Sequence, residues 1–360
     1  MTLRHIDQGE RLTRVIVAPD LPLTEAIQRL DRAGLGVLLL VDDAGRLAGL
    51  LTDGDLRRAL LSGNPLTGPC REIATVEPVS AAPDIEAADA LELMDTARNF
   101  ELNHLPLVDS VGCVTGLVLR SDMVADPGEL GVAAVVMAGG LGTRLRPLTD
   151  DTPKPMLPVG GRPLMEHIIG QLRESGIRRV NITTHYRHDK IAEHFGDGGG
   201  FGVEIEYVSE ERPLGTAGAL SLLAARTEPL LVVNGDILTR VDFRAMLGFH
   251  RRQEAAFTVG VRRFAVDVPY GIVETDGPEV REITEKPHFE FLVNAGIYLL
   301  EPEIVRLIPA DTRFEMNDLI GLAIAEGRRV VNFPIVEYWL DIGRPGDYAQ
   351  AQADAENGRL

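Results

Sequence analysis

A short glycine-rich turn after an apolar run is the feature that most constrains this chain. The run, Val132 to Met137, is predicted to be a buried strand. The turn after it reads Ala138-Gly139-Gly140-Leu141-Gly142-Thr143-Arg144-Leu145. Glycines at such a point let the backbone approach a phosphate chain closely, and Arg144 adds a fixed positive charge within reach of it. We therefore expect nucleotide phosphates to bind where this strand ends.

A second cation follows on a loop that two prolines stiffen. Pro153-Lys154-Pro155 begins nine residues after Arg144, and this spacing predicts a site for a nucleoside triphosphate whose pyrophosphate leaves. The turn is not a dinucleotide-binding fingerprint, because Leu145 occupies the third glycine position and no acidic residue ends the next strand, Val180 to Thr184. A G-x-x-x-x-G-K-[ST] loop is also missing. These differences argue against hydride transfer and against a P-loop enzyme.

Predicted strands and helices alternate from Val132 onward. The strands are 132–137, 179–184, 203–208, 230–234 and 293–300, and the helices are 163–175, 190–195, 216–225 and 346–355. Such alternation predicts an α/β fold with a mostly parallel sheet and helices on both faces. Ligands of these sheets bind beyond the carboxyl ends of the strands, where Gly139 and Asp236 both fall.

Seven motifs make the chain from about residue 132 to 355 similar to the sugar-1-phosphate nucleotidyltransferase family. In the family's order they are Gly139-Gly140-Leu141-Gly142-Thr143-Arg144-Leu145, Pro153-Lys154-Pro155, Pro213-Leu214-Gly215-Thr216-Ala217, Asn234-Gly235-Asp236, Glu285-Lys286-Pro287, Asn294-Ala295-Gly296-Ile297-Tyr298 and Trp339-Leu340-Asp341-Ile342-Gly343. The chain most resembles guanylyltransferases with an N-terminal CBS pair, including glucosamine-1-phosphate guanylyltransferases of legionaminic acid pathways and mannose-1-phosphate guanylyltransferase-like proteins. The resemblance implies a Rossmann-like, glycosyltransferase-A-like domain that joins an NTP to a sugar-1-phosphate with Mg²⁺.

The resemblance also implies roles for individual residues. Asp236 and Asp341 would hold Mg²⁺, while Arg144 and Lys154 would stabilise charge on the α-phosphate and the departing pyrophosphate. An Asx turn for Asp236, a helix cap for Asp341 and a surface salt bridge for either cation are the alternatives. The other expected nucleotide-binding residues are Ala138, Gly139, Gly140, Gly142, Thr143, Glu210, Pro213, Gly215 and Thr216.

The sugar-phosphate side of the site is expected around the later motifs. Lys286 would grip the phosphate and Glu285 would accept a hydrogen bond from a sugar hydroxyl. Asn294 and Gly296 would line the sugar pocket, with Tyr270-Gly271 across from them. The sequence leaves open whether the sugar is mannose, glucosamine, N-acetylglucosamine or heptose.

Glu210 bears on the choice of base. In relatives that use uracil or thymine, a Gln commonly lies three residues before the Pro of the proline-glycine loop, and Glu210 holds that place here. A carboxylate only accepts hydrogen bonds, and guanine offers two adjacent donors, so Glu210 favours GTP. A salt bridge from Glu210 to Arg212 is the competing interpretation. The same reaction with dTTP, UTP or ATP remains an alternative, as does a nucleotide-sensing protein without turnover.

The first 125 residues contain an internal repeat with an offset of 67 residues. Gly49 and Gly116 are one such pair, and Asp55 and Asp122 are another. Each half is predicted to contain a helix (about 23–33 and 84–97), two strands and a second helix. The repeats, about 12–62 and 73–125, should pack as one α+β module over residues 1–125, because a single unit cannot bury its own apolar face. A linker, 126–131, would join it to the transferase domain, 132–360.

This half resembles a tandem CBS domain, which implies an adenine or guanine nucleotide as ligand. The ribose-phosphate motif is complete in Gly49-Leu50-Leu51-Thr52-Asp53-Gly54-Asp55, where Thr52 would contact phosphate and Asp55 the ribose. The second copy ends at Asp122 but has Leu119 in place of the hydroxyl residue, so one nucleotide per chain is expected. Assembly into a homo-oligomer without any ligand is the alternative.

Charge and cysteine content limit the partners. The net charge of −18 repels nucleic acid and anionic membranes, so local cations must attract phosphates. Cys70 and Cys113 are expected to be reduced thiols. The first ten residues are charged and lack the apolar core of a signal peptide, and no apolar run is long enough to span a membrane. These features predict a cytoplasmic protein.

Overall fold

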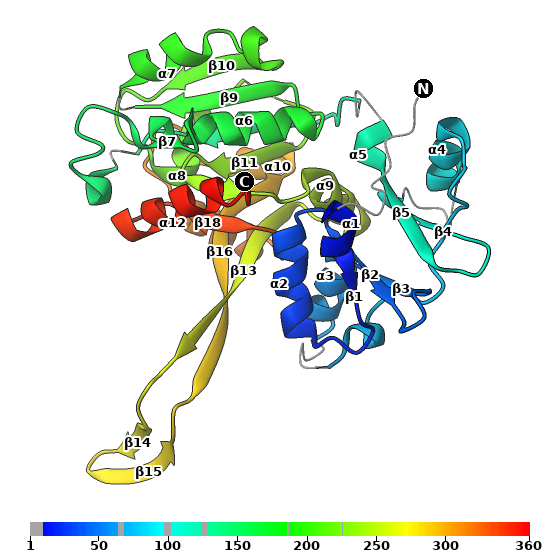
Figure 1. Cartoon of the computed structure of the whole chain (residues 1–360). Helices are drawn as coiled ribbons and strands as arrows, with labels where there is room; N and C mark the ends of the chain where they lie inside the picture. Colours follow the sequence, from blue (N-terminus) through cyan, green and yellow to red (C-terminus); the bar gives the residue numbers. More distant parts are fainter. Residues whose placement is uncertain are drawn as a thin grey trace.

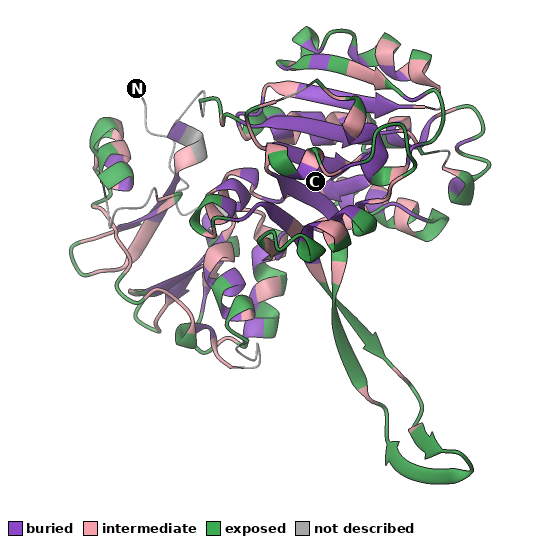
Figure 2. Ribbon diagram, turned by 180° about the vertical axis from the view of Figure 1, so that it is seen from behind, coloured by how far each residue is buried: buried purple, intermediate pink, exposed green. Residues whose placement is uncertain are grey.

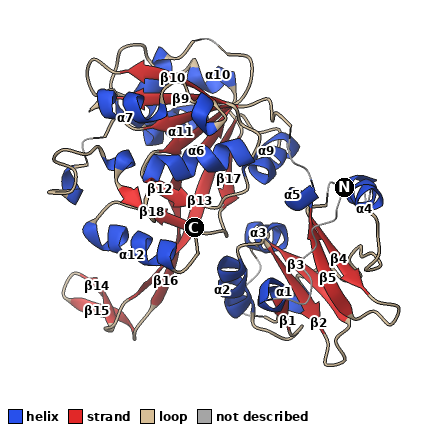
Figure 3. Cartoon of the chain, turned by 45° about the horizontal axis from the view of Figure 1, so that its top comes forward, coloured by secondary structure: helices blue, strands red, loops and turns tan. Residues whose placement is uncertain are grey.

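The computed structural model describes residues 10–63, 68–96, 102–123, 128–140, 142–185, 187–224 and 226–360. Figure 1 shows an N-terminal module (residues 10–123) beside a larger C-terminal domain (residues 128–360), from which one long hairpin projects. The α/β class expected for the C-terminal domain and the α+β class expected for the N-terminal module are both confirmed (Figure 3). Within the described residues, every helix is too short or too polar to cross a membrane.

The N-terminal module contains two similar units. The first comprises α1 (Glu10–Val15), β1 (Ile16–Val17), α2 (Leu23–Ala33), β2 (Val37–Val41), β3 (Leu47–Thr52) and α3 (Asp53–Leu61). The second comprises α4 (Ala87–Thr96), β4 (His104–Val108), β5 (Val114–Leu119) and α5 (Arg120–Met123), and η1 (Cys70–Glu72) lies between the two units. Strands β1–β2–β3 form one sheet and β4–β5 another.

The two units meet through their hairpin turns with the symmetry that the repeat predicts. Leu47 N donates to Gly112 O at 3.0 Å, and Val114 N donates to Gly45 O at 3.0 Å. Since 47 and 114, like 45 and 112, differ by 67, each bond is the repeat-related copy of the other. Leu117 of the second unit is fully buried in the core of the first. These contacts are what we would expect if the two repeats pack as one module.

The C-terminal domain is built on a seven-stranded sheet in the order β10–β9–β6–β11–β16–β13–β17. The strands are β6 (Ala133–Met137), β9 (Arg179–Thr184), β10 (Glu204–Ser209), β11 (Leu230–Asn234), β13 (Phe257–Asp267), β16 (His288–Leu300) and β17 (Val330–Pro334). Only β16 of these seven runs antiparallel to both of its neighbours. The helices are α6 (Leu164–Glu174), α7 (His188–Phe195), α8 (Gly215–Gly218), α9 (Phe243–Arg252), α10 (Pro302–Val305), α11 (Met316–Ala325) and α12 (Pro345–Glu356).

Helices cover both faces of this sheet. Alternate residues of β6 point to opposite faces, and Ala134 and Val136 pack with α6, α7 and α9 while Ala133 and Val135 pack with α8, α10 and α11. Both faces of β6 and β11 are therefore buried, which explains their unbroken apolar runs. The short elements η3 (Thr143–Leu145), η4 (Lys154–Met156), β7 (Pro158–Val159), β8 (Arg162–Pro163), η5 (Gly199–Phe201), η6 (Ala219–Leu222), β12 (Ile237–Thr239) and β18 (Trp339–Asp341) connect this framework.

Most predicted elements match, and two differ. The helix expected over 216–225 is instead the single turn α8 followed by η6, because Gly215 and Gly218 lie against Phe314 and Thr312 with no space for side chains. The strand expected over 293–300 begins earlier, at His288. Its extra length pairs with the end of β13 and forms the projecting hairpin.

We call this hairpin the arm and define it as residues 263–292, which include β14 (Ile272–Asp276) and β15 (Glu279–Thr284). Its side chains are almost all exposed, as Figure 2 shows. The pairs Phe264–Phe291 and Val266–Phe289 place four apolar side chains on one face of its stem. The opposite face carries charged residues, among them Arg263 bonded to Glu290.

The N-terminal module and the C-terminal domain share a buried junction at α3. Arg57 on α3 pairs with Glu337 at 2.7 Å, and the two side chains are only 7% and 6% exposed. Asp53, one turn earlier on α3, has its pKa raised to about 8. Burial is the largest cause, and the nearby carboxylates of Glu337, Asp242 and Asp31 add to it against the opposing charge of Arg57.

This junction predicts a pH-dependent stability. Between the ordinary Asp pKa of 3.8 and about 8, the folded chain keeps a proton on Asp53 that the unfolded chain has released. Stability therefore falls as pH rises through this window and is constant above it. Because the Asp53 side chain is half-buried rather than fully buried, we expect Asp53→Asn to raise the Tm at pH 8 by only roughly 2–4 °C, the effect of about 1 kcal/mol, and by less at pH 5. Calorimetry at both pH values, with the exposed Asp89→Asn as control, measures this; an equal change at both would contradict it.

Candidate active site

The candidate site lies at the carboxyl ends of β6 and β11, where the sequence places Gly139 and Asp236. These parallel strands are neighbours, and Gly235 N donates to Met137 O at 2.9 Å just beyond them. A Cβ at Gly139 would lie 2.7 Å from Glu210 Oε1, so a larger residue there would displace the Glu210 carboxylate. The start of the turn is thereby held against β10 and the loop that follows it.

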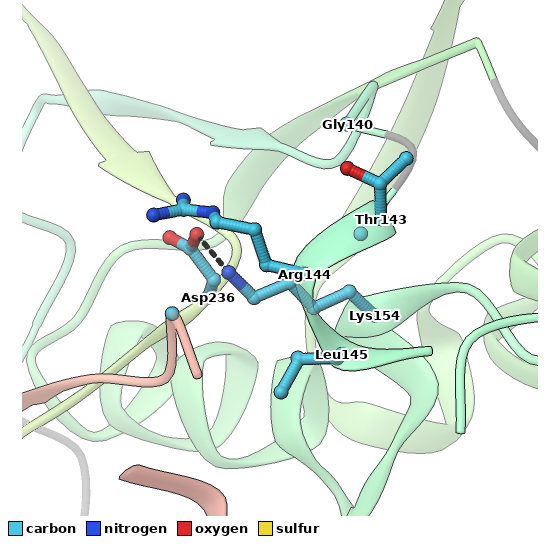
Figure 4. Close-up of a pocket in the computed structure, with 8 residues that line it drawn as sticks. Gly140, Thr143, Arg144, Leu145, Lys154 and Asp236 are labelled. Carbon is cyan, nitrogen blue, oxygen red and sulfur yellow. Dashed lines mark hydrogen bonds and ion pairs between the residues drawn. The ribbon is translucent and has the colours of Figure 1, made fainter. Parts of the chain in front are cut away.

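A pocket of about 330 Å³ opens at this edge of the sheet. Figure 4 shows the side chains of Arg144, Lys154 and Asp236 converging in it. Lys154 is 8% exposed and its Nζ lies 2.5 Å from Asp236 Oδ2, whereas Arg144 is exposed at the pocket. The residues that line the pocket are Gly140, Gly142, Thr143, Arg144, Leu145, Lys154, Asp236 and Gly343.

Backbone pairing brings Asp341 to the same place. Strand β12, which begins directly after Asp236, pairs with β18 so that Ile237 faces Asp341. Ile342 N also donates to Asp236 O at 3.0 Å. Desolvation is the largest cause of a raised pKa at Asp341; the charge of Asp236 adds to it, while Lys154 and Arg144 oppose it. Two carboxylates 105 positions apart are thus close enough for their charges to interact, and the charges of Lys154 and Arg144 act on the same place.

The donor set fits a hard divalent cation. Mg²⁺ is commonly bound by one or two carboxylates together with the oxygens of substrate phosphates. Asp236 and Asp341 supply such a pair, and no group of three or more His, Cys, Asp or Glu able to hold a metal occurs in the described part of the chain. The positive charges of Lys154 and Arg144 act to lower the pKa of Asp341, so the surroundings of this carboxylate partly favour its ionised form.

The local geometry does not support the alternative roles of the aspartates. Asp347, not Asp341, caps α12, since its carboxylate accepts from Gly343 N and Arg344 N. The bonded partner of the Asp236 carboxylate is Lys154 rather than a following backbone N–H. For Lys154 a salt bridge does exist, although it is buried in the pocket rather than exposed on the surface.

Glu210 is buried beside the glycine turn. It is 7% exposed, and its Oε2 accepts from Leu214 N at 2.8 Å. The proposed salt bridge to Arg212 is wrong, because Arg212 instead pairs with Asp311 at 2.8 Å. Burial raises the pKa of Glu210, opposed by the bond from Leu214 and the charge of His185. Its position between the turn and the proline-glycine loop remains compatible with a contact to the base.

A second pocket, of about 460 Å³, is lined by residues of β11, β16 and the start of α11. It contains three predicted site residues, namely Thr216, Asn294 and Gly296; the rest of the lining is Asn234, Tyr298, Glu315, Met316 and Asn317. Gly296 has φ +68°, and a side chain there would lie 2.5 Å from Asn234 Nδ2. Glu315 accepts from both the backbone N and the hydroxyl of Thr216 at 3.0 Å.

Asn234 and Glu315 were missed as site residues. Asn234 Oδ1 is buried without a hydrogen-bond partner among the described residues. Asn234 does stand in the Asn234-Gly235-Asp236 motif, so its position at the strand end was a usable signal. Glu315 gave no local signal, because it reaches the pocket from a segment 99 residues after Thr216.

Four predicted sugar-site residues lie on the arm and outside both pockets. Tyr270, Gly271, Glu285 and Lys286 belong to the exposed part of the projecting hairpin (Figure 1). Gly271 and Glu285 do lie together, since a Cβ at Gly271 would be 2.9 Å from Glu285 Oε2. The expectation that Tyr270-Gly271 faces Asn294 and Gly296 is not met in this conformation.

Three other predicted nucleotide-binding residues lie near the first pocket. Pro213 and Gly215 flank Leu214 near Glu210, and Ala138 is buried at the end of β6.

In the N-terminal module, Thr52 and Asp55 bond to each other. Asp55 Oδ2 accepts from Thr52 N and Oγ1, and Asp55 N donates to Thr52 Oγ1, which is a capping box at the start of α3. Arg58 also pairs with Asp55. These groups are thus already partnered locally, and the side chain of Asp122 lies outside the described residues.

Comparisons with known proteins agree with this geometry. A family model described as nucleotidyl transferase matches residues 133–358, and one described as CBS domain matches residues 12–62 and 70–126. Mannose-1-phosphate guanylyltransferase of Mycobacterium tuberculosis is 36% identical over 235 residues, 63% of this chain and 65% of that protein. D-glycero-alpha-D-manno-heptose 1-phosphate guanylyltransferase of Aneurinibacillus thermoaerophilus is 32% identical over 228 residues, 62% of this chain and 98% of that protein.

Solved structures show the same framework. The crystal structure of HddC from Yersinia pseudotuberculosis aligns with a TM-score of 0.50 at 26% identity, over 62% of this chain and 98% of that one. The present chain spans just under two thirds of the Mycobacterium relative and 61% of a Drosophila mannose-1-phosphate guanylyltransferase catalytic subunit beta.

Proposed function

Because the chain belongs to the nucleotidyl transferase family, we propose that it condenses a nucleoside triphosphate with a sugar-1-phosphate, giving an NDP-sugar and pyrophosphate. The observation that carries this proposal is the convergence of Arg144, Lys154, Asp236 and Asp341 beyond the glycine turn. Nucleotidyl transfer needs alignment of the attacking oxygen and neutralisation of charge more than covalent help from the protein. Arg144 and Lys154 supply positive charge for that neutralisation, and the two carboxylates would hold a metal ion that adds to it.

Each residue has a separate task in this mechanism. The turn at Gly139, Gly140 and Gly142 gives the triphosphate close access to the backbone. Arg144 and Lys154 face the α-phosphate and the pyrophosphate, where negative charge gathers as the bond to the leaving group breaks. The second pocket, with Asn294 and Asn317, offers amide donors and acceptors to sugar hydroxyls.

Asp236 and Asp341 are the residues that would hold Mg²⁺, the metal we propose for this site. The ion would supply Lewis-acid neutralisation of the phosphate oxygens. Holding Lys154 against Asp236 before substrate arrives also keeps the two carboxylates from repelling each other.

We further propose GTP as the nucleotide. The relatives reported above are named as guanylyltransferases for mannose-1-phosphate and heptose-1-phosphate, and Glu210 provides buried acceptors beside the nucleotide turn. A carboxylate can accept from guanine N1–H and the 2-amino group together. Mannose- and heptose-type sugar phosphates are accordingly the first substrates to test, followed by glucosamine and N-acetylglucosamine phosphates.

Glu210→Gln should weaken the preference for GTP over UTP. The amide accepts one guanine donor but sets its own N–H₂ against the other, which costs on the order of 1–3 kcal/mol. The ratio of kcat/KM for the two nucleotides should fall about tenfold, since 1.36 kcal/mol corresponds to a factor of ten. Glu211→Gln, which alters the exposed neighbour, is the matched control. An unchanged ratio in Glu210→Gln would remove this residue from the base pocket.

Pyrophosphate release measured with four NTPs against a panel of sugar-1-phosphates tests the whole proposal. Turnover with GTP and one sugar phosphate supports it, and turnover only with dTTP, UTP or ATP corrects the base. No turnover with any pair, despite nucleotide binding, would favour the nucleotide-sensing alternative. Lys286 enters this scheme only if the arm bends toward the pocket, so its role at the sugar phosphate stays a prediction.

For the N-terminal module we propose one adenine or guanine nucleotide per chain. Its binding would compete with the mutual capping of Thr52 and Asp55. Calorimetry with ATP, AMP and GTP on the full chain, with catalytic-site binding subtracted by use of Asp236→Asn, tests this. The expected homo-oligomer and cytoplasmic location also stay proposals; light scattering and cell fractionation test them.

A further inference from the structure

The segment that leads to Asp341 is held by the N-terminal module. Strand β17 ends at Pro334, residues 335–338 connect it to β18, and β18 ends at Asp341. Arg57 Nε donates to Pro334 O at 2.8 Å, and Arg57 Nη2 donates to Glu337 Oε1 at 2.7 Å. Arg57 therefore fixes both ends of this connection by charge-assisted hydrogen bonds.

Apolar packing joins the same segment to the same module. Val336 is 8% exposed and belongs to the hydrophobic core of the N-terminal module rather than to that of the sheet. The guanidinium carbon of Arg57 lies 3.9 Å from the ring centroid of Phe333, which is fully buried in the C-terminal domain. Each side of the junction thus inserts a side chain into the other.

Glu337, which Arg57 holds, also accepts hydrogen bonds from the backbone around it. Its Oε2 accepts from Val336 N at 3.0 Å and its Oε1 from Asp242 N at 3.4 Å, in addition to Arg57. Two residues further on, β18 begins its pairing with β12, which follows Asp236 directly. The path from Arg57 to the carboxylate pair is therefore short and consists of bonded groups.

We infer that Arg57 is a positioning residue that sets the placement of Asp341 opposite Asp236 through Glu337. The N-terminal module is then a structural part of the active site as well as a companion domain. Thr52 caps helix α3 and Asp55 lies in its first turn, so the helix that would contact a nucleotide also carries Arg57. The inference rests on the proposed function in its kinetic and metal-binding measurements, and the hydrogen-exchange measurement is independent of that function.

The test compares Arg57→Met with Arg29→Met, which changes an exposed arginine on α2 paired to Glu25. For Arg57→Met we expect kcat to fall about tenfold, within the range for residues that act through others, with the KM for the NTP changed less than about twofold. Titration with Mn²⁺ followed by electron paramagnetic resonance should show weaker binding. Hydrogen exchange of the peptide covering 334–342 should be faster. Arg29→Met should behave as the parent in all three measurements.

A second variant separates positioning from stability. Replacing a buried ion pair by apolar residues often preserves stability, so Arg57→Met/Glu337→Met should fold even if the single variant does not. Under our inference this folded double variant still has a reduced kcat, weaker Mn²⁺ binding and faster exchange at 334–342. Parent-like values in the double variant, or in a folded Arg57→Met, would overturn the inference. If the parent releases no pyrophosphate from any substrate pair, the proposed function fails, and hydrogen exchange at 334–342 still decides whether Arg57 holds this segment.

Discussion

Asp236→Asn should reduce kcat by on the order of 100-fold or more and leave the fold intact. Asn keeps the shape of the side chain but removes the charge that would hold the metal and that now pairs with Lys154. Metal-based charge neutralisation contributes several kcal/mol to such transition states, and each 1.36 kcal/mol is a factor of ten. Pyrophosphate release at saturating Mg²⁺ measures the loss.

The control for this variant is Asp89→Asn, which changes an exposed Asp on α4 of the N-terminal module, 147 positions before Asp236. Both variants should give the circular dichroism spectrum of the parent. Because Asp236 is part of an ion pair, a modest change in Tm is expected with it, and activity must be compared per folded molecule. A kcat within threefold of the parent at saturating Mg²⁺ would show that Asp236 is not a metal ligand.

The pocket could be predicted largely because its parts sit at strand ends. Gly139 and Asp236 follow apolar runs, and parallel neighbours bring such ends together. Asp341 could be assigned only through the family motif, since the pairing of β12 with β18 that delivers it is a tertiary feature. The pairing of Lys154 with Asp236 was likewise not readable, because nothing local links positions 82 residues apart.

The surroundings of the arm could not be predicted from its sequence pattern. Phe264, Val266, Phe289 and Phe291 lie on two paired strands, and the structure leaves the apolar face that they form exposed. Sequence pattern reports that a face is apolar and does not report what covers it. The motif around Lys286 was assigned to the site from the family resemblance, whereas in this conformation it lies on the projecting hairpin.

The junction at Arg57 was not predictable for a different reason. An arginine in a short helix is usually exposed to solvent, so the sequence gives no reason to expect Arg57 to be buried. Its partner Glu337 lies 280 residues away in the chain. Only the packing of two separately recognisable modules turns these charges into a buried pair. Motifs therefore located the chemistry of this chain, while the contacts that hold that chemistry in place came from the fold.

Lys154→Met should lower kcat by on the order of 100-fold, with a smaller effect on the KM for the NTP. The variant keeps the apolar stem but removes a fixed charge from a largely buried site, and loss of one such electrostatic stabiliser typically costs about 2.7–4 kcal/mol. The chain has only three lysines, which makes the comparison unusually clean. Lys190→Met is the matched control, because Lys190 Nζ bonds an exposed backbone carbonyl, Asp151 O.

The double variant Lys154→Met/Asp236→Asn gives the sharper measurement. Groups that act as one unit are not additive, so this variant should lose little more than the worse single variant. Fully multiplicative losses would show that Lys154 and Asp236 act independently despite their 2.5 Å contact. If Lys154→Met raised only the KM, the lysine would be a ground-state binding residue, because a group that acts as pyrophosphate leaves must affect kcat.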